Sequence, residues 1–171
     1  MDESLARWLV GPQGAEALAE ASAWPDPSSL AAAQALRHRW TPEQAATASR
    51  QVELRRRAVT KFGERAGALF FTSDGLEQAT RASVAAWRAS RFAGAGGSRV
   101  VDLGCGIGAD ALAFADAGLE VVAVELDPAT AVLAQANLGE RGRVVTGDAV
   151  ALAADLIKPG DAVFLDPARR T

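Results

Sequence analysis

Four acidic residues close or follow four short apolar segments in the second half of this 171-residue chain: Asp102, Glu125, Asp148 and Asp166. If the segments are parallel strands, their carboxyl ends meet at one edge of a sheet, where open α/β proteins bind ligands. The four carboxylates are therefore expected to converge on one crevice. Carboxylates in that position accept hydrogen bonds from ribose hydroxyls, so the pattern predicts a nucleotide-type site.

A glycine-rich turn, Asp102-Leu-Gly104-Cys-Gly106-Ile-Gly108, connects the first of these segments to a predicted helix. Glycine adopts backbone angles that other residues avoid, and its missing side chain lets a ligand approach the backbone. The amino end of the helix also favours a nearby carboxylate or phosphate. Several classes of nucleotide site contain such a turn, so the turn alone does not identify the ligand.

NAD and S-adenosylmethionine are the two candidate ligands for this site. The spacing Gly104-x-Gly106-x-x-Ala109 satisfies the dinucleotide fingerprint. Asp102 argues against NAD, because its negative charge would lie near the pyrophosphate. Acidic neighbours instead favour the ammonium and sulfonium groups of S-adenosylmethionine. Asp166-Pro167 has no role in the NAD fingerprint either, so the residues favour S-adenosylmethionine and methyl transfer.

Short apolar segments alternate with helical ones after residue 98. The predicted strands cover residues 100–103, 121–124, 143–146 and 162–165, and the predicted helices cover residues 109–117, 128–138 and 149–156. Asp127, which precedes Pro128, is the expected cap of the second helix. Near-continuous apolar strands separated by helices indicate a parallel sheet that is covered on both faces.

The chain is predicted to have two parts joined by a linker. Residues 1–92 have a helical pattern, in which Thr41-Pro42-Glu43-Gln44 has the signature of a helix start. Residues 93–98 form the glycine-rich linker. Residues 99–171 form the ligand-binding part. The expected fold class is therefore α/β, with a Rossmann-like parallel sheet preceded by an all-helical N-terminal domain.

Composition excludes several functional classes. A run of about 18 apolar residues, as a transmembrane helix requires, does not occur, and the acidic N-terminus does not resemble a secretory signal. Cys105 and His38 are the single cysteine and the single histidine, so neither an intrachain disulfide nor a metal site is expected. These features predict a cytoplasmic protein without a membrane partner.

Charge is unevenly distributed along the chain, whose net charge is −3. Residues 37–91, named the basic segment here, contain eleven Lys and Arg against five Asp and Glu. Such a segment can attract a polyanion such as RNA. It can equally be a solvated helix face, on which Glu53 pairs with Arg56 or Arg57. Charge alone leaves both interpretations open.

Residues 99–170 resemble class I methyltransferases, whose first motif is similar to Val100-Val-Asp-Leu-Gly-Cys-Gly-Ile-Gly108. The resemblance implies S-adenosylmethionine as the cofactor. By position, it places Asp102 at the amino group of the cofactor, Glu125 at the ribose and Leu126 on the adenine. The other implied cofactor contacts are Gly104, Cys105, Gly106 and Gly108 around the methionine part, Asp148 and Ala149 at the adenine, and Asp166 beside the methyl group.

A second resemblance concerns the lead-in to the sheet. Lys61-Phe-Gly-Glu-Arg65, Leu69-Phe-Phe-Thr72 and Gly75-Leu-Glu-Gln-Ala-Thr80 are similar to the lead-in of RNA cap guanine-N2 methyltransferases (trimethylguanosine synthase-like) and of bacterial relatives with a THUMP-like domain. In that branch the lead-in folds over the cofactor, which implies that Phe71 and Thr80 are cofactor neighbours. The alternative is that Phe70 or Phe71 belongs to the hydrophobic core.

The residues after the fourth strand depart from that branch. Base-amino methyltransferases usually have Asp/Asn-Pro-Pro-aromatic there, whereas this chain has Asp166-Pro167-Ala168-Arg169-Arg170. Asp166 is the expected catalytic residue, which orients the nucleophile. Pro167, Arg169 and Arg170 are expected to bind the substrate, because an arginine there can stack on a base or hold a phosphate.

A methyltransferase that acts on RNA is the favoured function. A small-molecule methyltransferase, and a nucleotide-binding or assembly module without activity, are the alternatives. Class I methyltransferases generally have seven strands and this chain ends after its fourth, so we expect a truncated fragment that is dimeric or poorly active. The bare fourth strand, with Val163 and Phe164, is the predicted site of homodimer formation.

Overall fold

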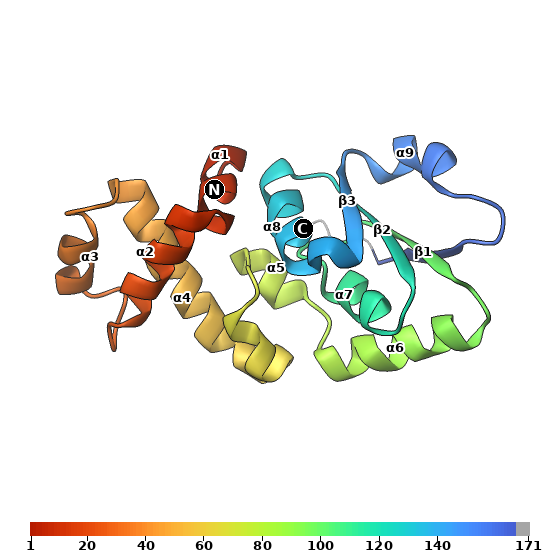
Figure 1. Ribbon diagram of the computed structural model, residues 1–171, viewed down its shortest axis with the longest axis horizontal. Helices are drawn as coiled ribbons and strands as arrows, with labels where there is room; N and C mark the ends of the chain where they lie inside the picture. Colours follow the sequence, from red (N-terminus) through yellow and green to blue (C-terminus); the bar gives the residue numbers. More distant parts are fainter. Residues whose placement is uncertain (167–171) are drawn as a thin grey trace.

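The computed structural model describes residues 1–166, and it places a helical region beside a parallel sheet (Figure 1). The helical region comprises α1 (Glu3–Val10), α2 (Pro12–Ser22), α3 (Leu30–Leu36), α4 (Pro42–Phe62), the 3-10 helix η1 (Gly63–Gly67), α5 (Ser73–Gln78) and α6 (Ala82–Gly94). Within the described residues, no helix is long and apolar enough to cross a membrane.

Strands and helices then alternate, as the sequence predicts. The elements are β1 (Arg99–Leu103), α7 (Ala109–Asp116), β2 (Glu120–Glu125), α8 (Pro128–Leu138), the 3-10 helix η2 (Gly139–Arg141), β3 (Gly142–Thr146), α9 (Ala149–Leu156) and β4 (Ala162–Leu165). The strand order is β3-β2-β1-β4, and all three strand pairs are parallel. The predicted Rossmann-like fold, preceded by helices, is therefore confirmed.

Two helix starts show why these segments fold locally. Thr41 accepts a hydrogen bond from the Gln44 amide, and the Gln44 side chain accepts one from the Thr41 amide, which makes a capping box at α4. Asp127 accepts hydrogen bonds from the amide and the hydroxyl of Thr130, and so caps α8. Both caps were predicted from the sequence and are confirmed.

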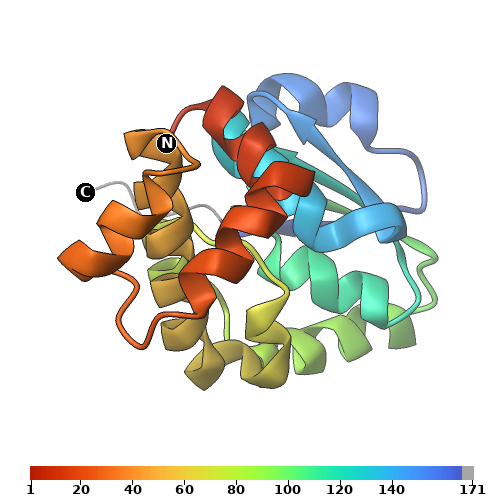
Figure 2. The same cartoon turned by 60° about the vertical axis from the view of Figure 1, so that its left-hand side comes forward.

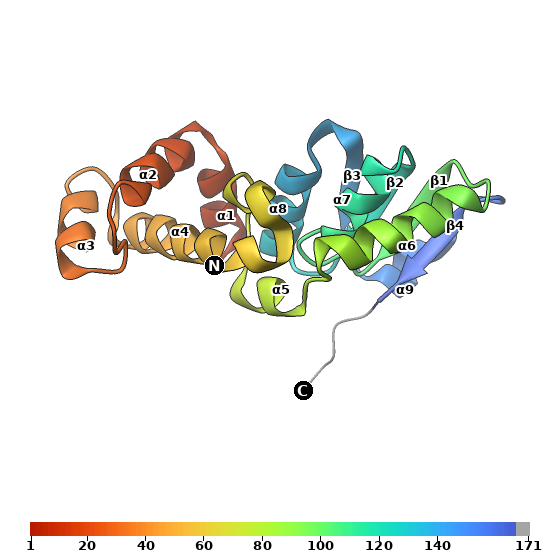
Figure 3. The same ribbon diagram turned by 90° about the horizontal axis from the view of Figure 1, so that it is seen from below.

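Helices cover the two faces of the sheet, with α6 and α7 on one face and α9 on the other (Figure 3). Successive strand residues point to opposite faces. Accordingly, Val100 packs with Phe114 of α7, whereas its neighbour Val101 packs with Leu156 of α9. Two buried layers thus enclose β1 and β2 and hold the carboxyl ends of these strands in fixed positions.

The edge strand β4 differs from the prediction in one respect. Phe164 was expected on the bare edge, but it is half-buried and its ring lies 5.4 Å from that of Phe114. The pairing of β4 with β1 turns Phe164 towards α7 and leaves Val163 and Leu165 on the α9 side, where they are 43% and 60% exposed. Homodimer formation through this edge remains a prediction.

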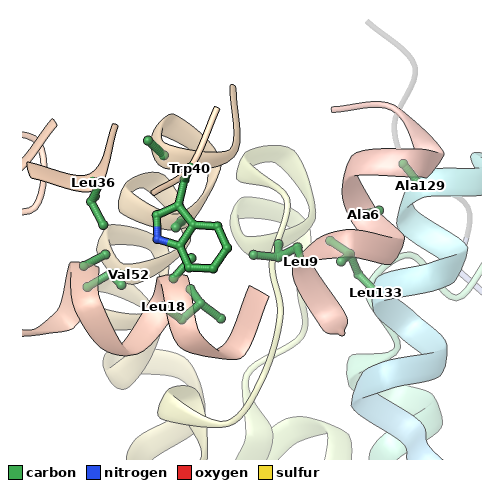
Figure 4. Packing of buried hydrophobic residues seen from close by; sticks show 12 residues of the cluster. Ala6, Leu9, Leu18, Leu36, Trp40, Val52, Ala129 and Leu133 are labelled. Carbon is green, nitrogen blue, oxygen red and sulfur yellow. The ribbon is translucent and has the colours of Figure 1, made fainter. Parts of the chain in front are cut away.

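The helical region and the sheet share one hydrophobic core through α1 and α8, which lie side by side (Figure 2). Ala6 and Leu9 of α1 belong to the same buried cluster as Ala129 and Leu133 of α8 (Figure 4). The cluster continues to Trp40, which the ring of Trp8 meets edge-on with the centroids 5.8 Å apart. The N-terminal helices therefore pack against α8, the helix that follows Glu125.

Candidate cofactor site

The glycine turn between β1 and α7 has a conformation that requires glycine. Gly104, Gly106 and Gly108 have φ angles of 92°, 56° and 83°, in the left-handed region that other residues rarely adopt. A Cβ added at Gly104 or Gly106 would meet no atom within 4 Å, so the backbone angle and not crowding excludes a side chain. The amides of Gly104 and Cys105 both donate to the Val124 carbonyl at 2.9 Å, which ties the turn to β2.

The Cys105 thiol lies inside this turn and is half-buried. Burial raises the pKa of the thiol well above its ordinary value, and the carboxylates of Asp102 and Glu125 raise it further. The thiol therefore stays protonated near neutral pH and is a poor nucleophile. Its place is structural, as part of the turn.

Glu125 joins the glycine turn to the start of α8. One carboxylate oxygen, Oε2, accepts a hydrogen bond from the Gly106 amide at 2.9 Å, and Oε1 accepts one from the Asp127 amide at 2.9 Å. Each carboxylate oxygen has two lone pairs, so both oxygens can still accept a bond from a ligand hydroxyl. The next side chain, Leu126, is 58% exposed. A fixed acceptor beside an exposed apolar side chain suits a nucleoside.

Asp148 lies at the end of β3 and caps α9. Its Oδ1 accepts hydrogen bonds from the amides of Val150 and Ala151 at 2.8 and 3.0 Å. Ala149 is the first residue of the helix, and the Val150 side chain is 87% exposed. The predicted contacts of Asp148 and Ala149 with an adenine stay predictions, and the cap fixes the orientation that the carboxylate would present.

Asp102 is buried without a hydrogen-bond partner. It is 1% exposed, and neither of its carboxylate oxygens has a partner in the described structure. Burial, with a further contribution from the carboxylates of Asp110 and Asp166, raises the pKa of Asp102 to about 8, although Arg88 opposes this rise. Ionising a buried carboxyl group that has no hydrogen-bond partner costs much free energy. A cationic ligand group at this end of β1 would stabilise the ionised form of Asp102.

Thr80, Asp110 and Arg88 form a polar chain beside the glycine turn. Thr80 Oγ1 donates to Asp110 Oδ2 at 2.7 Å, and Arg88 Nη1 donates to Asp110 Oδ1 at 2.6 Å. Arg88 Nη1 also lies 3.9 Å from Asp166 Oδ2. The sequence interpretation named Thr80 but missed Asp110 and Arg88. The position of Asp110, in the first turn of the helix after the glycine turn, was a signal that could have found it.

Phe71 requires a correction. It was expected beside the cofactor, but its side chain is 1% exposed and belongs to a hydrophobic cluster with Ile107 and Leu112. Its ring lies 5.4 Å from the Phe62 ring. The structure therefore gives Phe71 the core role that was the alternative. It supports the glycine turn through Ile107 and does not line the crevice.

Asn137 of α8 connects the lead-in to the glycine turn. Its Oδ1 accepts from the Phe70 amide at 2.7 Å, and its Nδ2 donates to the carbonyls of Phe70 and Ile107, both at 2.9 Å. The side chain is buried, so these three hydrogen bonds are shielded from water. Asn137 was also missed by the sequence interpretation, and it makes the lead-in a fixed wall of this region.

Asp166 is the last described residue. Its side chain is 61% exposed at the carboxyl end of β4. The carboxylate is therefore accessible, as the predicted catalytic role requires. The expected substrate-binding residues Pro167, Arg169 and Arg170 lie outside the described residues.

Many cations of the basic segment hold the helical region together. Arg56 donates to the carbonyls of Trp24 and Pro25, and Lys61 donates to three carbonyls at the end of α5. Arg39 pairs with Glu16 and Glu20, and Arg65 pairs with Asp116. The side chains of Arg39 and Arg65 remain 58% and 51% exposed. The segment thus combines structural contacts with an accessible positive surface.

Two family models match the chain. Residues 101–165 match a methyltransferase domain, and residues 2–58 match a domain of unknown function, DUF8688. No curated protein matches the chain. The first match covers the glycine turn and the residues at the ends of β1 to β4.

Among solved structures, the "putative methyltransferase" from Porphyromonas gingivalis W83 is similar over both the helical region and the sheet. It has a TM-score of 0.71 and 28% identity, over 91% of this chain and 41% of that protein. A "putative RNA methyltransferase" from Pyrococcus horikoshii has a TM-score of 0.45 and 27% identity, over 68% of this chain and 59% of that one. The methyltransferase PaMTH1 from Podospora anserina, solved with S-adenosylhomocysteine, has a TM-score of 0.44 and 21% identity, over 68% and 49%.

The sheet and the glycine turn have the Rossmann-like methyltransferase fold, and the methyltransferase domain that residues 101–165 match uses S-adenosylmethionine as its cofactor. The chain spans less than half the length of the Porphyromonas protein. The unpartnered carboxylate of Asp102 and the fixed acceptor of Glu125 fit the ammonium and the ribose of this cofactor.

Proposed function

We propose that this chain is the cofactor-binding part of a methyltransferase that acts on RNA. The observation that carries the methyltransferase assignment is the orphaned carboxylate of Asp102 beneath a glycine turn that Glu125 holds in place. An ammonium group would stabilise the ionised form of that carboxylate, whereas a pyrophosphate would place a further negative charge beside it.

The residues would hold the cofactor in separate parts. Asp102 would hold the ammonium group, Glu125 would accept hydrogen bonds from the ribose hydroxyls, and Leu126 would hold the adenine together with Asp148 and Ala149. When bound, S-adenosylmethionine supplies a methyl group activated by a sulfonium. The contribution of the protein is then to position the reactants and to place charge, since methyl transfer needs no covalent enzyme intermediate.

Asp166 is proposed to orient the nucleophile. Its carboxylate is exposed at the carboxyl end of β4 and lies 3.9 Å from Arg88. An exposed carboxylate there can accept a hydrogen bond from a substrate amino or hydroxyl group, and can take up its proton as the group becomes methylated. Pro167, Arg169 and Arg170 are proposed to contact the substrate.

RNA as the substrate rests on the basic segment. Arg37, Arg81 and Arg91 are exposed, and exposed arginines that pair with acids keep further N–H donors for a phosphate. A small-molecule substrate is the second candidate, because Arg56 and Lys61 are used for helix packing. Salt separates the two: binding of an RNA oligonucleotide should weaken steeply as salt rises, and binding of a small molecule should not.

The first test is calorimetric titration of the chain with S-adenosylmethionine and, separately, with NADH. We expect S-adenosylmethionine to bind and Glu125→Ala to raise its Kd roughly 10- to 100-fold, because charge-assisted hydrogen bonds of about 1.5–3 kcal/mol are lost. Glu140→Ala, at an exposed glutamate of η2, is the matched control and should leave the Kd unchanged. Binding of NADH in place of S-adenosylmethionine would overturn the assignment.

A further inference from the structure

Arg88 is a cation placed among carboxylates at the carboxyl edge of the sheet. Its Nη1 lies 2.6 Å from Asp110 Oδ1 and 3.9 Å from Asp166 Oδ2. Asp110 belongs to α7 and Asp166 follows β4, so the guanidinium of this α6 residue connects three elements. It therefore lies between the first turn of the helix that follows the glycine turn and Asp166, the residue proposed to orient the nucleophile.

The guanidinium of Arg88 is held in place by more than one contact. Its Cζ lies 4.8 Å from the centroid of the Phe164 ring, which supports a cation–π contact. The second oxygen of Asp110 accepts the hydroxyl of Thr80, so the acceptor is also fixed. The side chains of Arg88 and Asp110 are only 26% and 11% exposed, so water screens their charges weakly.

The charge of Arg88 acts on the buried carboxylate of Asp102. Asp102 is paired with Phe164 in the register of β1 and β4, so both side chains point to the α7 side of the sheet, where Arg88 and Asp110 lie. Arg88 lowers the pKa of Asp102, whereas Asp110 raises it. The charges of Arg88 and Asp110 therefore have opposite effects on the electrostatic potential at Asp102, the residue proposed to contact the cofactor.

We propose that Arg88 and Asp110 set the charge balance of the cofactor site, and with it the preference between S-adenosylmethionine and S-adenosylhomocysteine. The proposal rests on the methyltransferase function proposed above. The two ligands share the adenosine and the amino acid group, and they differ by a methyl group and the positive charge on sulfur. The ratio of their dissociation constants therefore measures how the site responds to one positive charge.

Opposite charge changes should move this ratio in opposite directions. Arg88→Gln keeps a hydrogen-bond donor but removes a positive charge, so the site should shift towards S-adenosylmethionine. Asp110→Asn is nearly isosteric and removes a negative charge, so the site should shift towards S-adenosylhomocysteine. A purely structural role would weaken both ligands together and would leave the ratio unchanged.

The experiment is calorimetric titration of the parent chain, Arg88→Gln and Asp110→Asn with each ligand. We expect the ratio to change roughly three- to tenfold in opposite directions in the two variants, as the loss of one partly screened unit charge near the cofactor implies. Arg88→Lys keeps the charge and should keep the parent ratio. Arg143→Gln, at an exposed arginine of β3 outside the basic segment, is the control and should also keep it.

Two outcomes would overturn the proposal and are distinguishable. If the parent binds both ligands but both variants keep its ratio, or shift it in the same direction, the charge balance is not set by this pair and the methyltransferase function stands. If the parent binds neither ligand, the proposed function fails and this inference fails with it. Should Arg88→Gln not fold, as judged by circular dichroism, the direction of the Asp110→Asn shift decides alone.

Discussion

Replacing Asp161 by alanine is expected to lower the free energy of unfolding by about 1.5–3 kcal/mol, because it removes the buried carboxylate that pairs with Arg99 and leaves that arginine only the exposed carboxylate of Glu120, 3.2 Å from its Nε. Asp161 pairs with Arg99, and the two side chains are 7% and 9% exposed. Arg99 also donates to the Leu156 carbonyl from both terminal nitrogens, at 3.2 and 3.3 Å. These contacts hold the arginine in place, so the guanidinium cannot turn to water when the carboxylate is removed.

The measurement is urea unfolding followed by circular dichroism. Asp155→Ala, at an exposed aspartate of α9, is the control and should change the stability by less than about 0.5 kcal/mol. The double variant Arg99→Met, Asp161→Leu should recover much of the loss, because apolar side chains remove both charges together. A cost below about 1 kcal/mol for Asp161→Ala would show that Arg99 does not depend on this carboxylate.

Replacing Asp102 by asparagine is expected to stabilise the protein without ligand, and to do so more at high pH. The pKa of Asp102 is about 8 in the folded protein, against an ordinary value of 3.8. Between about pH 4 and 8, Asp102 is therefore protonated in the folded protein and ionised in the unfolded chain. Since the unfolded chain binds fewer protons there, the stability of the parent falls as pH rises through this range and levels off above it.

A pKa shift of this size corresponds to a loss of about 6 kcal/mol in the free energy of unfolding across this pH range. We expect the free energy of unfolding of Asp102→Asn to exceed that of the parent by about 3 kcal/mol at pH 8.5. The gain is smaller than the full pKa contribution because the buried amide still lacks hydrogen-bond partners. The advantage should be smaller at pH 5, where Asp102 of the parent is already neutral. Parallel pH profiles of parent and variant in urea unfolding would contradict this, and Asp155→Asn provides the control profile.

The variant should also bind S-adenosylmethionine more weakly, since an amide does not match the ammonium charge. A residue that destabilises the fold but aids the ligand is a recurrent feature of binding sites. Stability and affinity would thus move in opposite directions in Asp102→Asn. A purely structural carboxylate would give no such opposition.

The parts of the fold that follow local rules could be predicted from the sequence. The glycine turn requires left-handed backbone angles at Gly104, Gly106 and Gly108, and glycine is the residue type that adopts them readily, so the sequence itself indicates the turn. The cap at Asp127 and the alternation of strands and helices are likewise local. Fold class and the position of the site at the strand ends follow from these features together.

The parts that were missed depend on side chains brought together from distant segments. Asp110 meets Arg88 across 22 residues and Thr80 across 30, and Asn137 meets Phe70 across 67. No local pattern indicates such pairs. Phe71 was misplaced for a related reason, because an aromatic residue suits both a ligand pocket and a core, and only the burial of its neighbours decides.

The packing of α1 against α8 has a consequence for synthesis of the protein. Ala6 and Leu9 leave the ribosome more than a hundred residues before Leu133, their partner in the shared cluster. At synthesis rates of about 5–20 residues per second, α8 is synthesised roughly 6–25 s after α1, and the apolar face of α1 lacks this partner during that time. The helical region cannot finish its packing ahead of the sheet, so a pause in translation before α8 prolongs the exposure of that face.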